Sequence, residues 1–266
     1  MITALEAVLR KPGRFVVKQY AASYETLLLL VHILRGMRGM LGTANRKVFV
    51  RQFYFTAVEP IPLVIAGAFL SGAVIVAFVF ASFSSFGLSQ RVGEAVMIIL
   101  VNEIAALFVA VVVMIRSGSA IIAELALMRL NRELETLNAL GIDLHEYLTA
   151  PRCAALVLST VLLSVLFCFV SILGGFLAYG YLHNIAFYDY LEIMAEAAGF
   201  ADFVTVYVKA LMFGLIIALF SIRNGLDVTE SITEVPVRLI AGLTRQTILI
   251  FFFVIFYDIL RYGTVL

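Results

Sequence analysis

The apolar positions of the chain fall into five long runs, at roughly 61–86, 95–115, 153–182, 203–222 and 239–260. A helix crosses a bilayer core of about 30 Å with about 20 predominantly apolar residues. Each run reaches that length, so the pattern predicts five transmembrane helices. The first 45 residues contain no comparable run, because their longest apolar stretch, Leu27–Leu34, has only eight residues.

A shorter periodic pattern lies between the second and third runs. Apolar residues recur there at spacings of three and four, with charged residues between them: Leu127, Leu130, Leu134, Leu137, Leu140, Leu144, Tyr147 and Leu148. This spacing is typical of one face of a helix. The segment at about 119–148 is therefore predicted to be an amphipathic helix, or two short helices hinged at Gly141, that is too polar to cross a bilayer.

Residues 1–52 are predicted to form one or more helices that lie at the membrane interface. Arg10, Lys11, Arg14 and Lys18 would face lipid head groups. A signal peptide is not predicted, because no apolar core followed by a small-residue cleavage site is found near the start.

Composition supports a membrane protein. Charged residues make up 14% of the chain and the mean hydropathy is +1.05, whereas ordinary soluble chains have roughly 25% charged residues. We therefore expect an all-α integral membrane protein with a single domain over residues 1–266, of which residues 53–266 form the five-span part. The net charge of +1 gives no indication of nucleic-acid binding.

Lysine and arginine are distributed unevenly between the two sides of the membrane. Sixteen of the nineteen lie before the first run, in the 116–152 connection or in the 223–245 connection. Because cytoplasmic loops carry an excess of positive charge, the N-terminus and the 116–152 connection are predicted to be cytoplasmic and the C-terminus to lie outside.

Besides Arg245 near the start of the fifth run, three charged residues fall inside the predicted spans: Glu103, Lys209 and Asp258. A charge at the centre of a membrane helix costs about 2.5–3.5 kcal/mol on insertion scales, so each one needs a physical reason. One interpretation is a salt-bridged cluster that fixes helix packing. Another is contact with a lipid head group or control of a cavity mouth, and a third, for Asp258, is snorkelling to the interface.

Cysteine and histidine give no indication of a disulfide or a metal site. Cys153 and Cys168 are fifteen residues apart in one apolar run, which corresponds to about 22 Å along a helix. The three histidines are scattered, and none lies at ligand spacing from a cysteine.

The run IRSGSAIIAELALMRLNRELETLNALGIDLHEYLTAPR, Ile115–Arg152, resembles the signature of the MlaE/YrbE permease family, the membrane subunits of MCE-associated lipid ABC transporters. The similarity extends to Val50–Phe55 and to the five-run layout. The matching positions are Arg116, Gly118, Ser119, Ala123, Glu124, Met128, Glu133, Leu137, Gly141, Asp143, Pro151 and Arg152.

The resemblance implies a fold and a set of site residues. It implies a homodimer in the bacterial inner membrane, with a phospholipid cavity that includes Glu103, Lys209, Asp258, Phe83 and Ile104. A coupling helix between the second and third spans would dock a cytoplasmic ATPase dimer through Glu133, Glu135, Leu137, Leu140, Gly141, Asp143 and Arg152. Arg116, Gly118, Ser119, Glu124 and Pro151 belong to the structural signature, and an MCE protein is expected on the periplasmic side.

Two segments depart from the family pattern. The family commonly has Leu-Gly-Pro after the acidic residue, where this chain has Ile104, Ala105 and Ala106, so the helix break expected there is predicted to be absent. Residues 226–247 lack the family's Gly-rich segment with two threonines, so we expect a different geometry before the fifth span.

The absence of catalytic motifs separates three functional hypotheses. The chain contains no G-x-x-x-x-G-K-[ST], so a partner ATPase is expected to bind ATP and Mg²⁺, and this chain is expected to have no cofactor or metal. H-E-x-x-H and G-x-S-x-G are also absent, which disfavours a membrane-embedded lipid-modifying enzyme. A permease subunit is the leading hypothesis, and a non-transporting structural subunit is the alternative.

Overall fold

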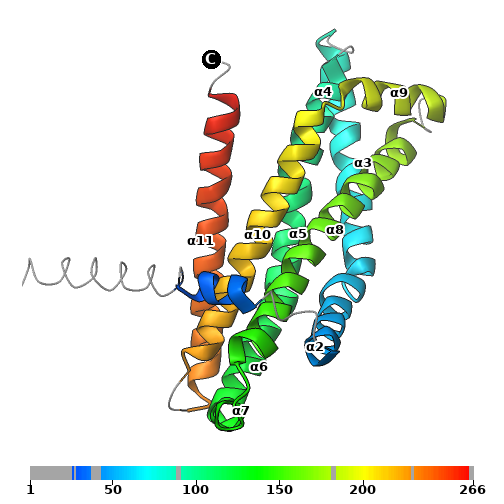
Figure 1. Cartoon of the computed structure of the whole chain (residues 1–266). Helices are drawn as coiled ribbons and strands as arrows, with labels where there is room; N and C mark the ends of the chain where they lie inside the picture. The colour runs from blue at the N-terminus through cyan, green and yellow to red at the C-terminus, as the bar shows by residue number, and fades with distance from the viewer. Residues whose placement is uncertain are drawn as a thin grey trace, which may run out of the picture.

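The computed structural model describes residues 26, 28–36, 43–87, 91–180, 184–228 and 231–263, and every element within them is helical (Figure 1). Several helices contain π-helical turns, labelled η. In chain order the elements are α2 Thr43–Phe53, η2 Tyr54–Val58, α3 Ile61–Ser85, α4 Val92–Val96, η4 Met97–Ala105, α5 Ala106–Val113, η5 Met114–Gly118, α6 Ser119–Leu130, α7 Glu133–Ala139, η6 His145–Thr149, α8 Ala150–Gly175, η7 Phe176–Gly180, α9 Phe187–Ala197, α10 Phe200–Leu226 and α11 Glu234–Tyr262.

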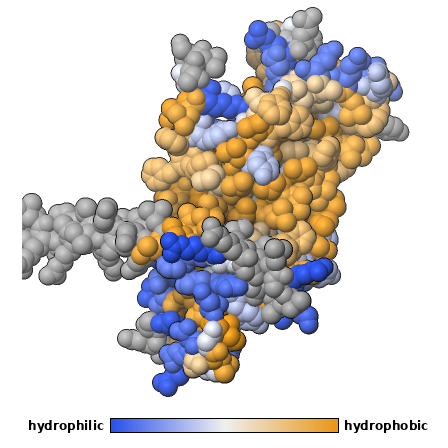
Figure 2. Space-filling view, viewed as in Figure 1, coloured by the Kyte–Doolittle hydropathy of each residue, from blue (hydrophilic) through white to orange (hydrophobic). Residues whose placement is uncertain are grey.

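Five helical stretches of the described residues are long and apolar enough to cross a membrane, as the sequence predicts. They are Arg46–Ser85, Val92–Leu130, His145–Gly180, Phe200–Leu226 and Glu234–Tyr262. Each is longer than its apolar run, because the helix continues into more polar residues at its ends. Figure 2 shows the result as a broad apolar band across the middle of the molecule, with polar residues gathered at both ends.

The five spans lie side by side, with α8 and α10 in the interior and α11 at one edge (Figure 1). Helix α8 packs against both α3 and α10, and α10 also packs against α11. We call the end that carries the α6–α7 turn the α7 end, and the opposite end, which carries α4 and α9, the α9 end. Helix α11 is covered least, since only Gly242, Gln246 and Ile250 of its residues are buried.

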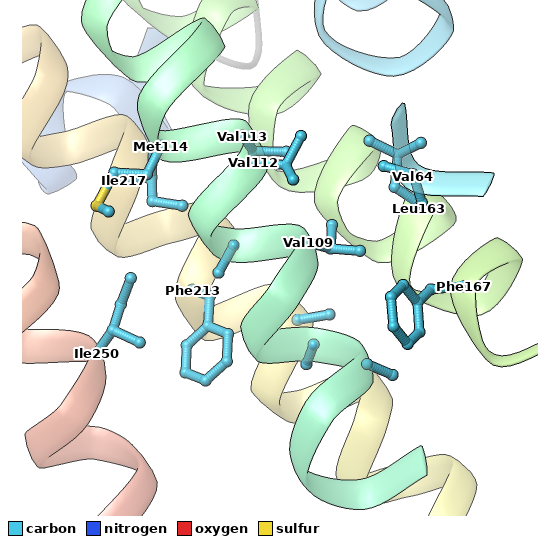
Figure 3. Packing of buried hydrophobic residues seen from close by; sticks show 14 of the residues in the cluster. Val64, Val109, Val112, Val113, Met114, Leu163, Phe167, Phe213, Ile217 and Ile250 are labelled. Atoms are coloured by element: carbon cyan, nitrogen blue, oxygen red, sulfur yellow. The ribbon is translucent and has the colours of Figure 1, made fainter. Parts of the chain in front are cut away.

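The core is formed by the inward faces of α5, α8 and α10. Val109 and Val113 of α5 lie between Phe167 of α8 and Ile217 of α10, and Ile250 reaches toward this layer from α11 (Figure 3). Lipid tails are as apolar as these side chains, so association inside a bilayer depends mainly on close van der Waals packing.

Helices α3 and α8 approach each other most closely at two glycines. A Cβ atom added to Gly72 would lie 1.9 Å from the carbonyl oxygen of Ser171, and one added to Gly174 would lie 2.4 Å from that of Phe69. Small residues at such crossings allow two backbones to touch. Glycine is therefore required at both positions for the α3–α8 contact.

The predicted amphipathic segment at about 119–148 is not one helix. Residues 119–130 form α6, which continues the second span. The chain then breaks at Arg132, where φ is +60°, and again at Gly141, where φ is +75°. The hinge at Gly141 is confirmed. The prediction of one continuous apolar stripe is wrong, because Leu134 is buried whereas Leu140 is 71% exposed.

The predicted N-terminal interfacial region is only partly described. Residues 28–36 are helical and α2 begins at Thr43, but residues 1–25, with the four basic residues expected to face lipid, lie outside the described residues. The helix at 28–36 contacts η6, since the His32 and His145 rings stack with 5.0 Å between their centroids. Its interfacial position stays a prediction.

Candidate functional site

The three charged residues of the spans meet at one point, although they come from three different helices. Lys209 lies on α10, Glu103 on η4 and Asp258 on α11. The Lys209 Nζ atom is 2.8 Å from each carboxylate oxygen of Glu103 and 2.8 Å from Oδ1 of Asp258. The sequence singled out these residues, and the structure shows that one lysine pairs with both acids.

The two acids contact Lys209 in different ways. Both oxygens of Glu103 accept hydrogen bonds from Nζ. The Asp258 contact is an ion pair, and Asp258 Oδ1 accepts no hydrogen bond within the described part of the chain. The Tyr257 ring covers a further side of the ammonium group, with 5.5 Å from Nζ to its centroid. This arrangement is a cation–π contact.

The members of this ion cluster differ in exposure. The Lys209 side chain is 1% exposed, whereas Glu103 is 32% and Asp258 is 25% exposed. The cation is therefore enclosed by its partners, and the two carboxylates form the accessible edge of the cluster.

A second polar cluster lies one to two turns closer to the α9 end, and sequence reasoning missed it. Asp202 at the start of α10 accepts hydrogen bonds from Asn102 of η4 at 2.8 Å and from Arg261 of α11 at 2.6 Å. Thr205 accepts hydrogen bonds from Arg261 and, at 3.2 Å, from Tyr257. The same three helices are thus joined twice.

Helical spacing could have indicated this second cluster. Asp202 and Lys209 are seven residues apart, which places them on one face of α10, and Asn102 directly precedes Glu103. Arg261 follows Asp258 by three residues, so it lies on the same face of α11.

Two apolar residues expected at the cavity, Phe83 and Ile104, pack against the main core and are partly buried. Ile104 follows Glu103 on η4, next to the ion cluster in sequence. Phe83 lies on α3, which contributes no residue to the cluster. The structure therefore does not bring Phe83 into contact with the three charges.

Most residues expected to dock an ATPase surround the exposed turn at the α7 end. Leu140, Gly141 and Asp143 are exposed after α7, and Leu137 is partly buried. Within α7, Glu133 and Glu135 are both exposed. The turn is held in shape locally, because Asp143 accepts a hydrogen bond from the His145 backbone N–H at 2.8 Å.

Arg152 does not belong to this exposed surface, and its assignment to ATPase docking is corrected. Its side chain is only 5% exposed, at the start of α8 just after Pro151. It donates a hydrogen bond to Glu124 of α6 at 2.8 Å, and Glu124 is 56% exposed. A buried guanidinium cannot contact a separate protein, so Arg152 links α8 to α6.

The remaining signature residues hold the α7 end together. Arg116 of η5 pairs with Glu59, just before α3, and lies over the Phe55 ring at 5.7 Å. It therefore links the second span to the residues just before α3. A Cβ on Gly118 would lie 3.0 Å from Ser221 Oγ of α10, and Ser119 Oγ donates to the Arg116 carbonyl at 3.2 Å.

Neither cysteine is a member of the ion cluster of Glu103, Lys209 and Asp258. Cys153 and Cys168 are free thiols. Within the ranges that the structure describes, no group of three or more His, Cys, Asp or Glu residues could hold a metal ion.

The family model described as Permease MlaE matches residues 49–260, well over half of the chain. The chain belongs to the MlaE permease family. A "Probable ABC transporter permease protein" of Synechocystis is 30% identical over 209 residues, which cover 79% of this chain and 77% of the relative. A protein of Rickettsia typhi with the same description is 28% identical over 178 residues, with coverage of 67% and 69%.

A further relative carries a more specific name. The "Intermembrane phospholipid transport system permease protein MlaE" of Haemophilus influenzae is 24% identical over 195 residues, which cover 72% of this chain and 75% of the relative. The range matched by the MlaE family model includes Glu103, Lys209 and Asp258, as well as the exposed turn at Gly141.

This MlaE-family chain differs from the family pattern after Glu103, and the structure shows the consequence. Where the family commonly has Leu-Gly-Pro, residues Ile104–Ala106 continue the helix, and α5 follows η4 directly. The predicted absence of a break is confirmed. The hydrogen bonding is nevertheless π-helical from Met97 to Ala105, so Glu103 sits on a widened stretch of helix. Such stretches are frequent at functional sites.

Proposed function

We propose that this chain is the membrane subunit of an ATP-driven phospholipid transporter in the bacterial inner membrane. The observation that carries the proposal is the MlaE family match, which reaches from residue 49 to residue 260 and includes residues of all five spans. The name of the Haemophilus influenzae relative supports a phospholipid as substrate. The ion cluster of Glu103, Lys209 and Asp258 is the proposed polar part of the lipid site.

ATP hydrolysis is assigned to a cytoplasmic ATPase dimer. The chain has no P-loop sequence, so a partner must bind ATP and Mg²⁺. The exposed turn around Leu140 and Gly141 is the proposed docking surface. In the proposed orientation the α7 end is cytoplasmic, and the α9 end faces the periplasm and an MCE-domain protein.

Two copies are proposed to form the lipid cavity. Five helices are few to enclose a lipid, and a dimer matches the two-fold symmetry of two ATPases. The exposed face of α11 supports this arrangement, because apolar side chains recur on it at helical spacing. They are Ile248, Phe252, Ile255, Phe256 and Ile259. We therefore place α11 at or near the dimer axis.

Purification of the full chain from its native membrane, with its neighbours, tests the proposal. We expect an ATPase and phospholipid to co-purify, with the lipid identified by mass spectrometry. Lipid chemistry performed by the isolated chain would instead support the enzyme hypothesis. An ATP-independent complex without bound lipid would support the structural-subunit hypothesis.

Cysteine cross-linking in native membranes tests the dimer. Phe256→Cys on α11 should cross-link between two copies. Phe78→Cys is the matched control, because Phe78 is similarly exposed on α3, away from the proposed axis. Monomer alone from both variants would contradict the proposed dimer.

A further inference from the structure

The accessible charge of the ion cluster is negative. Lys209 is 1% exposed, and the exposed atoms of the cluster belong to Glu103 and Asp258. A molecule that approaches this point along the exposed edge therefore meets two carboxylates before it can reach the ammonium group.

The Lys209 ammonium group is already surrounded by acidic and aromatic partners. A lysine ammonium carries three N–H donors and no acceptor. Its Nζ atom already lies 2.8 Å from three carboxylate oxygens, two of Glu103 and one of Asp258. The Tyr257 ring lies on a further side of Nζ. A lipid phosphate would have to displace one of the carboxylates to bind this lysine.

The carboxylates, by contrast, retain unused acceptor positions. An ionised carboxylate offers about four lone-pair sites. Glu103 uses one site on each oxygen for Lys209, and Asp258 contributes only its Oδ1 to the ion pair. Two carboxylates around one ammonium leave a formal charge of −1. An uncompensated charge is costly inside a membrane span, and a cation bound at the exposed edge of the two carboxylates would compensate it.

We propose that the exposed edges of Glu103 and Asp258 bind the ammonium group of a zwitterionic phospholipid head group. The proposal rests on the proposed transport function and assigns its substrate class. A primary ammonium can donate hydrogen bonds to both carboxylates, whereas a quaternary ammonium carries a positive charge but has no N–H group to donate. A glycerol head group offers no cation. The expected order of preference is therefore ethanolamine, then choline, then glycerol.

Tyr257 is suited to the same ligand. Its ring already lies 5.5 Å from one ammonium group, that of Lys209, and its side chain is partly exposed beside Asp258. Aromatic faces attract cations, including quaternary ammonium groups. This explains why the choline head group is placed above glycerol.

The first experiment uses the wild-type complex, purified with its partners and reconstituted in nanodiscs that contain equal amounts of phosphatidylethanolamine, phosphatidylcholine and phosphatidylglycerol. Native mass spectrometry then identifies the lipid that stays bound. We expect phosphatidylethanolamine to be enriched about tenfold over phosphatidylglycerol, since one charge-assisted contact of this kind corresponds to about a factor of ten in affinity. N-acetylation of phosphatidylethanolamine, which removes the ammonium charge, should abolish the enrichment.

Variants then assign the preference to the two acids. Glu103→Gln and Asp258→Asn should each lower the enrichment while phospholipid remains bound. Glu192→Gln is the matched control, because Glu192 is an exposed acid on α9, away from the cluster. If either variant fails to fold, the comparison of native and N-acetylated lipid on the wild-type complex still tests whether the site selects the ammonium group.

The outcomes separate this inference from the proposed function. Bound phospholipid without head-group preference, or enriched in phosphatidylglycerol, overturns the ammonium site and leaves the transport function standing. A complex that binds no phospholipid at all overturns the proposed function together with this inference. A site occupied by a cationic side chain of a second copy, detected as loss of the dimer in both acid variants, also overturns it.

Discussion

Asp202 of α10 and Arg261 of α11 form an ion pair near the α9 end, with 2.6 Å between Oδ1 and Nη2. Asp202 also accepts a hydrogen bond from Asn102, so one carboxylate joins three helices. Helix α11 has few buried residues: Gly242 and Gln246 lie in its half nearer the α7 end, and Ile250 lies near its middle. We infer that this pair, together with Asp258, holds the other half of α11 against α10.

The Asp202–Arg261 pair can be tested by a double-mutant cycle. Asp202→Ala and Arg261→Ala should each lower the melting temperature of the detergent-solubilised protein, because each leaves a partly buried charge without its partner. The double variant should be less destabilised than the sum, with a coupling free energy of about 0.5–3 kcal/mol. Glu192→Ala, at an exposed position of the same end, should leave the melting temperature unchanged. Additive single effects would contradict the pairing.

Replacement of Lys209 should reduce the yield of folded protein. Lys209→Met leaves two carboxylates without their buried cation. We expect it to lower the free energy of unfolding by about 3 kcal/mol, the low end of the cost of breaking a buried ion pair, because both acids are partly exposed. Adding Glu103→Gln and Asp258→Asn removes the uncompensated charges and should restore the yield. Size-exclusion chromatography after expression at matched levels measures both effects. An unchanged yield for Lys209→Met would show that packing does not depend on this lysine.

Two leucines between the second and third spans should respond differently to the same substitution. Leu140→Asp places a charge on an exposed turn, so the permease should fold normally and lose the co-purifying ATPase. Leu134→Asp places a charge at a buried position and should destabilise the permease itself. Asn138→Asp, exposed on the same helix, is the control for added charge alone. Full ATPase binding by Leu140→Asp would show that this turn is not part of the docking surface.

The α3–α8 crossing should not tolerate a methyl group at Gly72. Gly72→Ala brings a Cβ atom to 1.9 Å from the Ser171 carbonyl oxygen, so the two helices must separate. Overpacking of this kind costs about 1–3 kcal/mol, and thermal unfolding in detergent should show a lower melting temperature. Gly199→Ala is the control, because its nearest neighbour would lie at 3.4 Å. Equal melting temperatures for the two variants would contradict the close approach.

Several features could be predicted from local sequence because they depend on single residues or short windows. Apolar runs of bilayer length identified the five spans, because the bilayer favours apolar side chains at each position whatever their tertiary contacts. A charge inside such a run is unusual, and this alone selected Glu103, Lys209 and Asp258. Gly141 was predicted as a hinge, and its φ of +75° is a conformation that glycine adopts without strain.

Other features depended on contacts that local sequence does not contain. The break at Arg132 was missed because a left-handed backbone is uncommon for residues other than glycine, asparagine and aspartate. Arg152 was assigned to the docking surface by the family resemblance, which carries no information about its burial. Its burial results from the packing of α8 against α2 and α10, helices formed by distant parts of the chain.

The sequence by itself determined that this chain is helical, that it crosses the membrane five times and that three charges lie within those spans. The bilayer imposes these properties on each segment separately, so composition and periodicity are sufficient to find them. Only the tertiary structure decided that Lys209 is enclosed by both acids and that Asp202 pairs with Arg261. Those contacts depend on how each helix is rotated about its axis and how deeply it packs. Both are set by van der Waals contacts between segments 59 to 106 residues apart.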